Sequence, residues 1–227
     1  TDSMILEDDG WVNLRNPQTK DIYFFGYSYN YLDAVKDYYR LTGIPPMLPA
    51  YVLGNWWSRY HKYTQQEYLD LMEKFKSEDI PISVGVIDMD WHIVDVPEEL
   101  NKQYAEFNSA LTGGWTGYTW NTELFPDYKQ FLKELKSKNI AASLNLHPAH
   151  GIRKHEIMFE EMAKALGVDP ENAVALPFDI LNKKYMENYF DIVHHPYEED
   201  GIDFWWIDFQ QGNTYYWKYS NDYSGER

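Results

Sequence analysis

The protein has 227 residues, of which 44% are hydrophobic and 18% are aromatic, so it can bury one substantial core. Its formal net charge of −16 argues against nucleic acid as a partner, because phosphate binding depends on clustered lysine and arginine. The absence of cysteine excludes disulfides and thiol catalysis. The 9 Trp, 20 Tyr and 11 Phe leave two interpretations open, an aromatic-rich core or flat faces that stack on sugar rings.

Neither a membrane span nor a secretion signal is expected. No stretch approaches the roughly 20 apolar residues that cross a bilayer. The start, "TDSMILEDDG", lacks a basic segment followed by an apolar one. The compartment stays open, with a cytoplasmic location favoured, and the polar start indicates a piece of a longer protein.

Short strands and turns are predicted for residues 1–27, followed by one helix. In "GWVNLRNPQTKDIYFFGYSY" a turn containing proline separates two aromatic-rich segments. The helix begins at about Asn30 and ends at Gly43, because apolar residues recur there at helical spacing. Pro45 and Pro46 then mark a linker between domains.

Strands and helices alternate through the rest of the chain. A capping box formed by Thr64 and Glu67 begins the first helix of this series. Strands are predicted at 50–57, 82–87, 139–150 and 204–207, with helices beginning near 64, 126, 156 and 182. This alternation predicts about four βα units with a parallel sheet, which is either part of a barrel or doubly wound. No glycine-rich phosphate loop follows a strand, which disfavours a nucleotide-binding sheet.

Four polar residues follow the predicted strands at the points where the apolar runs end. They are Asp88, Asp90, His147 and Asp208. Barrel enzymes carry their chemistry at this edge of the sheet. Asp208 follows four bulky apolar residues in "FWWIDFQQG", which suits a carboxylate nucleophile, although a strand-terminal Asp that caps the next turn is the simpler interpretation.

The other strand-end residues allow more than one role. Asp88 and Asp90 in "DMD" could bind sugar hydroxyls, hold the divalent ion of a glycosyltransferase, or lie in a solvated turn. His147 and His150 are separated by a proline and lack further ligands, so no metal site and no cofactor are predicted. His147 fits a hydroxyl-binding residue or a buried structural histidine.

The four segments "RLTGIPPMLPAYVLGNWWSRY", "VGVIDMDWH", "WNTELFPDYKQFLKELKSKNIAASLNLHP" and "DGIDFWWIDFQQG" together resemble glycoside hydrolase family 31, the α-glucosidase and α-xylosidase family. The resemblance covers residues 21–212. It implies a retaining α-glycosidase with a (β/α)8 barrel preceded by a β-sandwich. On this basis residues 1–48 are the end of the sandwich and a linker helix, and residues 49–227 are the first half of the barrel.

The resemblance also assigns roles to individual residues. Asp208 matches the catalytic nucleophile, Trp206 matches a wall of the subsite for the cleaved sugar, and Asp88 matches the carboxylate that binds sugar hydroxyls there. Trp57 and Tyr60 fall in the region that lines the same subsite. The family's acid/base aspartate is expected beyond the end of this chain.

The sugar specificity is left open by the residues after the nucleophile. Many family members have an Asn-Glu or Gly-Glu pair there, whereas this chain has Phe209, Gln210 and Gln211. An α-glucosidase acting on an α-glycoside or oligosaccharide is favoured, with an α-xyloside, an α-galactoside or an N-acetylated sugar as alternative substrates. A non-catalytic carbohydrate-binding protein and a metal-dependent glycosyltransferase are the other classes considered. The 227-residue chain alone is expected to be inactive and, because half a barrel exposes sheet edges, to self-associate.

Overall fold

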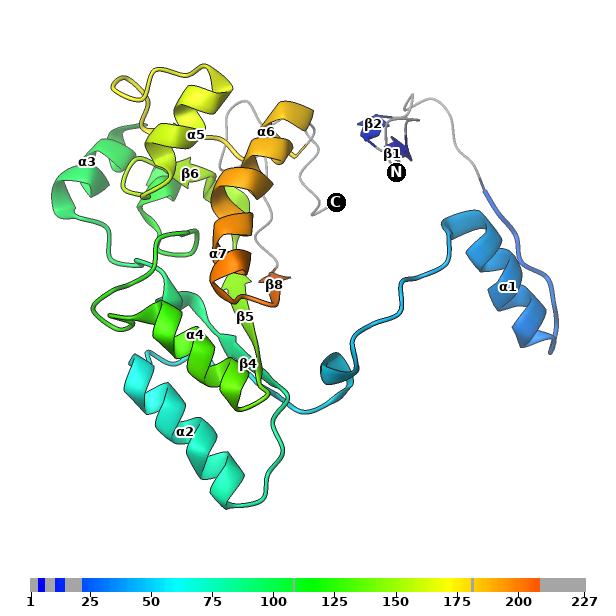
Figure 1. Cartoon of the computed structure of the whole chain (residues 1–227). Helices are drawn as coiled ribbons and strands as arrows, with labels where there is room; N and C mark the ends of the chain where they lie inside the picture. Colours follow the sequence, from blue (N-terminus) through cyan, green and yellow to red (C-terminus); the bar gives the residue numbers. More distant parts are fainter. Residues whose placement is uncertain (1–3, 7–10, 15–21, 108, 181, 209–227) are drawn as a thin grey trace. The chain divides into compact units, whose positions relative to one another are not determined.

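A computed structural model of the protein describes residues 4–6, 11–14, 22–107, 109–180 and 182–208 (Figure 1). Its contacts divide the chain into two compact units, Thr1–Ala50 and Tyr51–Arg227. No helix within the described ranges has the length and apolar character needed to cross a membrane.

The first unit contains a small antiparallel hairpin and one helix. Strand β1 (Met4–Leu6) pairs with β2 (Val12–Leu14), which confirms short strands in this region. Helix α1 (Tyr31–Thr42) ends at Gly43, which adopts a φ of 87° and donates its N–H to the carbonyl of Tyr39 at 2.9 Å. The predicted helix is therefore confirmed, and its glycine stop has the positive φ that favours this residue type.

The second unit is built on a four-stranded parallel sheet. It comprises β3 (Trp56–Trp57), β4 (Val84–Ile87), β5 (Ala141–Leu146) and β8 (Phe204–Ile207), in that order. Each strand adds beside the previous one and the order never reverses, whereas a doubly wound sheet reverses at a switch point. The sheet is thus part of an α/β barrel, as predicted from the resemblance.

The two faces of the sheet have different neighbours, because successive side chains of a strand point to opposite sides. Val84, Val86 and Ala141 form one cluster with Tyr51 and Phe204, which marks the inner face. The outer face packs against helices. Helices α2 (Gln65–Ser77) and α4 (Tyr128–Ser137) lie side by side there (Figure 1).

Helices α2 and α4 end in the same way before their strands. The N–H of Ile80 bonds to the carbonyl of Phe75 at 2.9 Å, and the N–H of Ile140 bonds to that of Leu135 at 3.0 Å. The preceding residues, Asp79 and Asn139, have φ values of 61° and 57°. This left-handed stop resembles a Schellman motif and turns each chain directly into the sheet.

The predicted capping box is present, and two further helices begin with a side-chain cap. Thr64 and Glu67 form the reciprocal bonds of a capping box at the start of α2. Asp127 accepts the N–H of Gln130 at 3.0 Å to begin α4. Asn182 accepts the N–H of Tyr185 at 3.1 Å to begin α6 (Lys183–Asn188).

Several elements differ from the predictions. The strand expected at 50–57 is a 3-10 turn, Ala50–Leu53, followed by the two-residue β3. The long connection after β4 contains an unpredicted helix, α3 (Glu98–Phe107). The helix begun by Asn182 passes through a π-helical stretch, Tyr189–His194, before α7 (His195–Asp200).

The part of the chain between β5 and α6 completes the described elements. It holds a short antiparallel pair, β6 (Ile152–Arg153) and β7 (Ala175–Leu176), and helix α5 (Phe159–Leu166), which ends at a left-handed Gly167. Short 3-10 turns occupy Met89–Trp91, Ser109–Thr112 and Pro148–His150. The first and last of these follow β4 and β5 directly, so both strands end in tight turns.

Candidate functional site

Three of the predicted residues lie at the carboxyl ends of adjacent parallel strands. Asp88 follows β4, His147 follows β5 and Asp208 follows β8. Strand alternation places Asp88 on the side of Val84 and Val86, which is the inner face. All three residues therefore meet at one edge of the sheet.

Asp208 is attached to β5 by its backbone and by its side chain. Its N–H donates to the carbonyl of Leu146 at 2.9 Å, which continues the β5–β8 ladder. Its Oδ2 accepts a hydrogen bond from Asn145 Nδ2 at 3.1 Å and lies 3.5 Å from His147 Nε2. With 30% of its side chain exposed, the carboxylate is fixed in direction and still reachable.

His147 connects the two carboxylates electrostatically. Its side chain is buried, and burial lowers the pKa of the imidazole, while the negative charges of Asp208 and Asp88 act in the opposite direction. The net shift is downward, so the ring is neutral at neutral pH. A neutral ring next to Asp208 leaves the negative charge of the carboxylate available for chemistry.

Asp88 and Asp90 occupy the turn after β4. The carboxylate of Asp88 accepts the N–H of Met89 at 2.7 Å and so caps the Met89–Trp91 turn. Burial raises the pKa of Asp90, helped by the charges of Asp88 and Asp95 and opposed mainly by that of Lys62. Burial thus favours the protonated form of the Asp90 carboxyl group.

Trp91 ties this turn to the neighbouring strand. Its indole is completely buried, and Nε1 donates to the backbone carbonyl of Asn145 at 2.8 Å. The turn that carries Asp88 is therefore connected to the residue that contacts Asp208. Neither Trp91 nor Asn145 was among the residues predicted from the sequence.

Aromatic side chains lie beside the acids on the inner face. Trp206 is the register partner of Asn145 and is 37% exposed. It contributes to an apolar hollow of about 610 Å³. The hollow is lined by Trp56, Ser58, Phe204, Trp205, Trp206 and Ile207.

Of the two predicted residues in the "NWWSRY" segment, the structure places Trp57 away from this surface. Trp57 packs against Phe75 of α2, with ring centroids 5.0 Å apart, so it belongs to the helix-covered outer face. Trp56 is instead in register with Val84 and contacts Phe204, at 5.2 Å between ring centroids. Tyr60 lies in the following loop and is 67% exposed. The strand register could have identified Trp56, but the sequence alone does not fix it.

A second aromatic wall comes from the loop between α3 and α4. The ring of Trp115 meets that of His147 edge-on, with centroids 5.1 Å apart. Thr116 donates its hydroxyl to the carbonyl of His147 and accepts the N–H of His150 at 3.1 Å. The loop formed by residues 113–120, "GGWTGYTW", is therefore hydrogen-bonded to the chain at the end of β5.

Two buried charges hold this loop in place. Arg153 donates to the carbonyls of Leu111 and Gly113, each at 2.7 Å, and also to that of Thr116. Glu156 accepts the N–H of Tyr118 at 3.1 Å and the hydroxyl of Thr119 at 2.6 Å.

The carboxylate of Glu156 stays charged inside the protein. Burial alone would raise its pKa, but the adjacent His155 ring, the hydrogen bond from Thr119 and the positive charge of Arg153 bring the net shift downward. His155 Nε2 lies 3.2 Å from Glu156 Oε1. The loop is thus organised by a buried ionic network that sequence spacing did not reveal.

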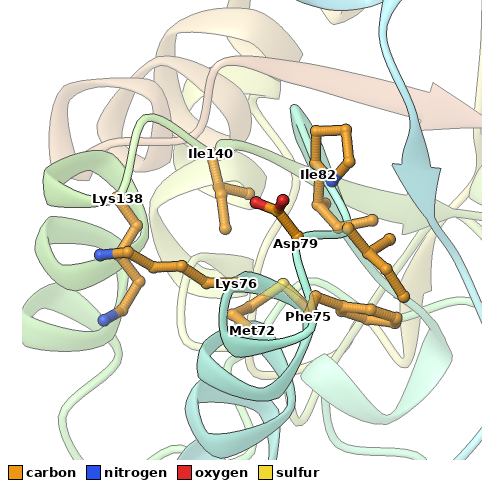
Figure 2. Close-up of a pocket in the computed structure, with 9 residues that line it drawn as sticks. Met72, Phe75, Lys76, Asp79, Ile82, Lys138 and Ile140 are labelled. Atoms are coloured by element: carbon orange, nitrogen blue, oxygen red, sulfur yellow. The ribbon is translucent and has the colours of Figure 1, made fainter.

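The opposite end of the sheet has a different hollow, of about 390 Å³ (Figure 2). It is lined by Met72, Phe75, Lys76, Asp79, Ile80, Pro81, Ile82, Lys138 and Ile140. These residues precede β4 and β5 rather than follow them. The hollow has one acidic residue and lies at the edge of the sheet that barrel proteins use for stability.

The region described by the structure contains no group of three or more histidines and acids that could hold a metal ion. The turn residues Phe209, Gln210 and Gln211, on which the sugar specificity was expected to depend, lie outside the described residues.

A parallel sheet in sequential order, with acids and aromatic residues at its carboxyl ends, defines part of a (β/α) barrel with its site at the mouth. Residues 45–226 match the model of the glycosyl hydrolases family 31 TIM-barrel domain. The chain belongs to this family.

The chain resembles several individual proteins of known name. It is 24% identical to an alpha-xylosidase of Saccharolobus solfataricus over 85% of its length, and 26% identical to alpha-glucosidase 2 of Bacillus thermoamyloliquefaciens over 81%. These matches cover 23% and 22% of the two relatives, so the chain spans about a quarter of their length. Its fold is similar to that of a GH31 alpha-xylosidase from a soil metagenome, with a TM-score of 0.52, 22% identity, and 74% of this chain and 23% of that chain covered.

Proposed function

We propose that the whole protein is a retaining α-glycoside hydrolase in which Asp208 is the nucleophile. The observation that carries this proposal is the position of the Asp208 carboxylate, which is partly exposed at the end of β8 and hydrogen-bonded to Asn145. The family membership supports the reaction class. A carboxylate held in this way can attack an anomeric carbon without first being reoriented.

The reaction proceeds in two balanced steps. In the first, an oxygen of Asp208 forms a bond to the anomeric carbon, the glycosidic C–O bond breaks, and a protonated carboxyl group gives its proton to the departing oxygen. In the second, that same carboxyl group removes a proton from water, the water oxygen bonds to the anomeric carbon, and Asp208 is released. We propose that this acid/base comes from the part of the whole protein not included in the 227-residue chain.

The residues around Asp208 bind the −1 sugar, which is the sugar whose anomeric carbon is attacked. Asp88 accepts hydrogen bonds from sugar hydroxyls, and Asp90 assists from the same turn. His147 lies 3.5 Å from Asp208 and offers a neutral ring nitrogen to a nearby hydroxyl. Trp206 and Trp56 supply flat faces within the apolar hollow. Tyr60 supplies a further ring to the sugar from the exposed loop after β3.

We propose an α-glucoside as the substrate and retain an α-xyloside as the second candidate, because relatives of both names are similar to this chain. The two sugars differ by the hydroxymethyl group on the ring. Initial rates of the whole protein on nitrophenyl α-glucoside and nitrophenyl α-xyloside decide between them. A ratio of kcat/KM above about 10 in favour of the xyloside would replace the first candidate, since one carbon in a pocket is worth about that factor.

Trapping of the covalent intermediate tests the proposed role of Asp208. The whole protein is incubated with a 5-fluoroglycosyl fluoride of the sugar it cleaves, digested, and analysed by mass spectrometry. We expect the label on Asp208. A label on another residue would overturn the assignment, and binding without any turnover would favour a non-catalytic carbohydrate-binding protein.

The 227-residue chain alone is proposed to lack hydrolase activity and to self-associate. Retaining hydrolysis requires two carboxyl groups about 5 to 5.5 Å apart, and only the nucleophile is assigned here. Appreciable hydrolysis by this chain would identify an acid among its own residues, with Asp90 as the first candidate because its pKa is raised by burial. Light scattering measures the association, and a monomer would contradict it.

A further inference from the structure

Asn145 is the buried amide side chain of strand β5, whose other residues are alanine, leucine and one serine. It is 1% exposed and lies on the same face of the strand as Ser143, opposite Trp206 in the register of the sheet. A buried amide destabilises the folded state unless its polar atoms find partners. Its presence at this point of the strand therefore needs an explanation.

The hydrogen bonds of Asn145 are directed toward the proposed nucleophile. Its Nδ2 donates to Asp208 Oδ2 at 3.1 Å. Because an ionised carboxylate only accepts hydrogen bonds, the amide must present its nitrogen to Asp208, and Oδ1 faces elsewhere. Among the described residues this Oδ1 has no hydrogen-bond partner. Asn145 therefore keeps its hydrogen bond to Asp208, although its own Oδ1 is left without a hydrogen-bond partner among the described residues.

The backbone at Asn145 is fixed independently. Its carbonyl accepts the indole N–H of the fully buried Trp91 at 2.8 Å. The register of β5 with β8 places the side chain next to Asp208. The amide is therefore a preorganised donor, because little freedom is left to it before substrate binds.

We propose that Asn145 is a positioning residue that sets the orientation of the Asp208 carboxylate for attack on the anomeric carbon. This inference rests on the proposed function, in which Asp208 is the nucleophile. A neutral amide suits the role, since the carboxylate loses its negative charge as the new bond forms. A cationic donor binds the charged form more strongly and would oppose that step.

A purely structural role predicts the opposite behaviour on substitution. Leucine has nearly the same shape as asparagine and needs no hydrogen bonds in an apolar interior. If Asn145 served stability, Asn145→Leu would unfold the protein more easily and leave the rate of a folded molecule unchanged. If it positions Asp208, the folded variant is slow while sugar binding is retained.

The experiment compares Asn145→Leu with Ser143→Ala in the whole protein. Ser143 is also buried on the inner face of β5, but it is in register with Phe204, four residues before Asp208, so it is a matched control. The rate of Asp208 labelling by the 5-fluoroglycosyl fluoride, KM and the unfolding temperature are measured for each variant. Asn145→Asp, which keeps the size and replaces the donor by an acid, serves the same measurement if Asn145→Leu does not fold.

We expect Asn145→Leu to be labelled about 10- to 100-fold more slowly than the wild type, a loss typical of a misoriented reacting group. KM should change by less than about 3-fold, and Ser143→Ala should be labelled at the wild-type rate. Equal labelling rates for Asn145→Leu and the wild type would overturn the inference and leave the proposed function intact. A wild-type label away from Asp208 would overturn the proposed function and the inference with it.

Discussion

The two ends of the parallel sheet are organised on different principles. At the amino ends, α2 and α4 stop with the same left-handed residue and the same pair of backbone bonds before β4 and β5. At the carboxyl ends, Asp88, His147 and Asp208 lie close together, and the buried Asn145 Oδ1 has no hydrogen-bond partner among the described residues. The repeated helix stops at the amino ends support the sheet, whereas the irregular carboxyl ends carry the polar groups of the candidate site.

The comparison of the two ends separates residues that stabilise the fold from residues that serve a site. A stabilising turn satisfies its own backbone and can be repeated, as the stops at Asp79 and Asn139 show. A site keeps charged and polar groups close together even though each costs free energy to bury. Substitutions at the carboxyl ends should therefore reduce activity, and those at the amino ends should alter stability alone.

The largest effect is expected at the proposed nucleophile. Asp208→Ala should lower kcat of the whole protein by about 10⁴-fold or more, as removal of a catalytic group does in other enzymes. Its unfolding temperature should stay close to that of the wild type, because the side chain packs little and is 30% exposed. Steady-state kinetics and calorimetry check both parts. Retained activity would show that Asp208 only caps a turn.

Loss of Arg153 should give the largest effect on stability. Its three carbonyl bonds are buried next to the charge of Glu156, so Arg153→Met leaves three carbonyls without their donor and removes one positive charge beside Glu156. The expected destabilisation is about 3 to 5 kcal/mol, measured by denaturant unfolding. Lys164→Met is the matched control, because Lys164 is an exposed cation on α5 and should change stability by less than about 0.5 kcal/mol. Similar values for both variants would show that the buried network does not organise the loop.

Substitution of Asp88 tests whether the residue that follows β4 stabilises the transition state of the reaction at Asp208. Asp88→Ala should raise the activation free energy by about 2 to 4 kcal/mol, because hydroxyl contacts near the reacting carbon strengthen in the transition state. Asp90→Ala should have a milder effect. The kinetic readout is the division between kcat and KM. An increase in KM alone would assign Asp88 to substrate binding without a role in the transition state.

Acid should destabilise the carboxyl-end loops through buried histidines. Burial lowers the pKa of His92 and of His150 to about 4, against an ordinary value of 6.5. The unfolded chain therefore binds more protons below pH 6.5, and the stability present above that pH is lost as the pH falls toward 4. Each group accounts for about 2 kcal/mol by pH 4.5. Unfolding free energies measured from pH 7.5 to 4.5 should show less decline for His150→Asn, and an unchanged slope would contradict this origin.

The smallest effect is expected at the amino ends. Asp79→Gly should raise the unfolding free energy by about 0.5 to 1 kcal/mol, because glycine adopts the φ of 61° without strain. Glu78→Gly is the matched control. Because Glu78 has a φ of −94°, glycine at this position should lower the unfolding free energy of the protein. Activity should be unchanged in both. A loss of activity would break the division between the two ends.

The sequence predicted the ends of the strands better than their register. Asp88, His147 and Asp208 could be placed together because each follows an apolar run, and parallel strands bring such positions to one edge. Trp56 and Trp57 could not be told apart in the same way. In a two-residue strand, a shift of one position exchanges the inner and outer faces.

The supporting residues were hidden for a different reason. Asn145 lies inside a run that reads as apolar, and its bond to Asp208 spans 63 residues of sequence. Arg153 and Glu156 act through carbonyls and amides of a distant loop, which no local pattern encodes. Helix α3 in the connection after β4 was not predicted from the sequence. These features depend on tertiary contacts, which sequence periodicity does not report.

Chemical rescue of Asp208→Ala tests the central claim most directly. An activated α-glycoside is given to this variant of the whole protein with azide, a small anion that fits the space left by the carboxylate. The account predicts that azide restores turnover and that the product is the β-glycosyl azide, because the anion attacks from the side of the missing nucleophile. Absence of rescue, or equal rescue of Asp88→Ala, would contradict the assignment of Asp208 as the nucleophile at the carboxyl end of β8.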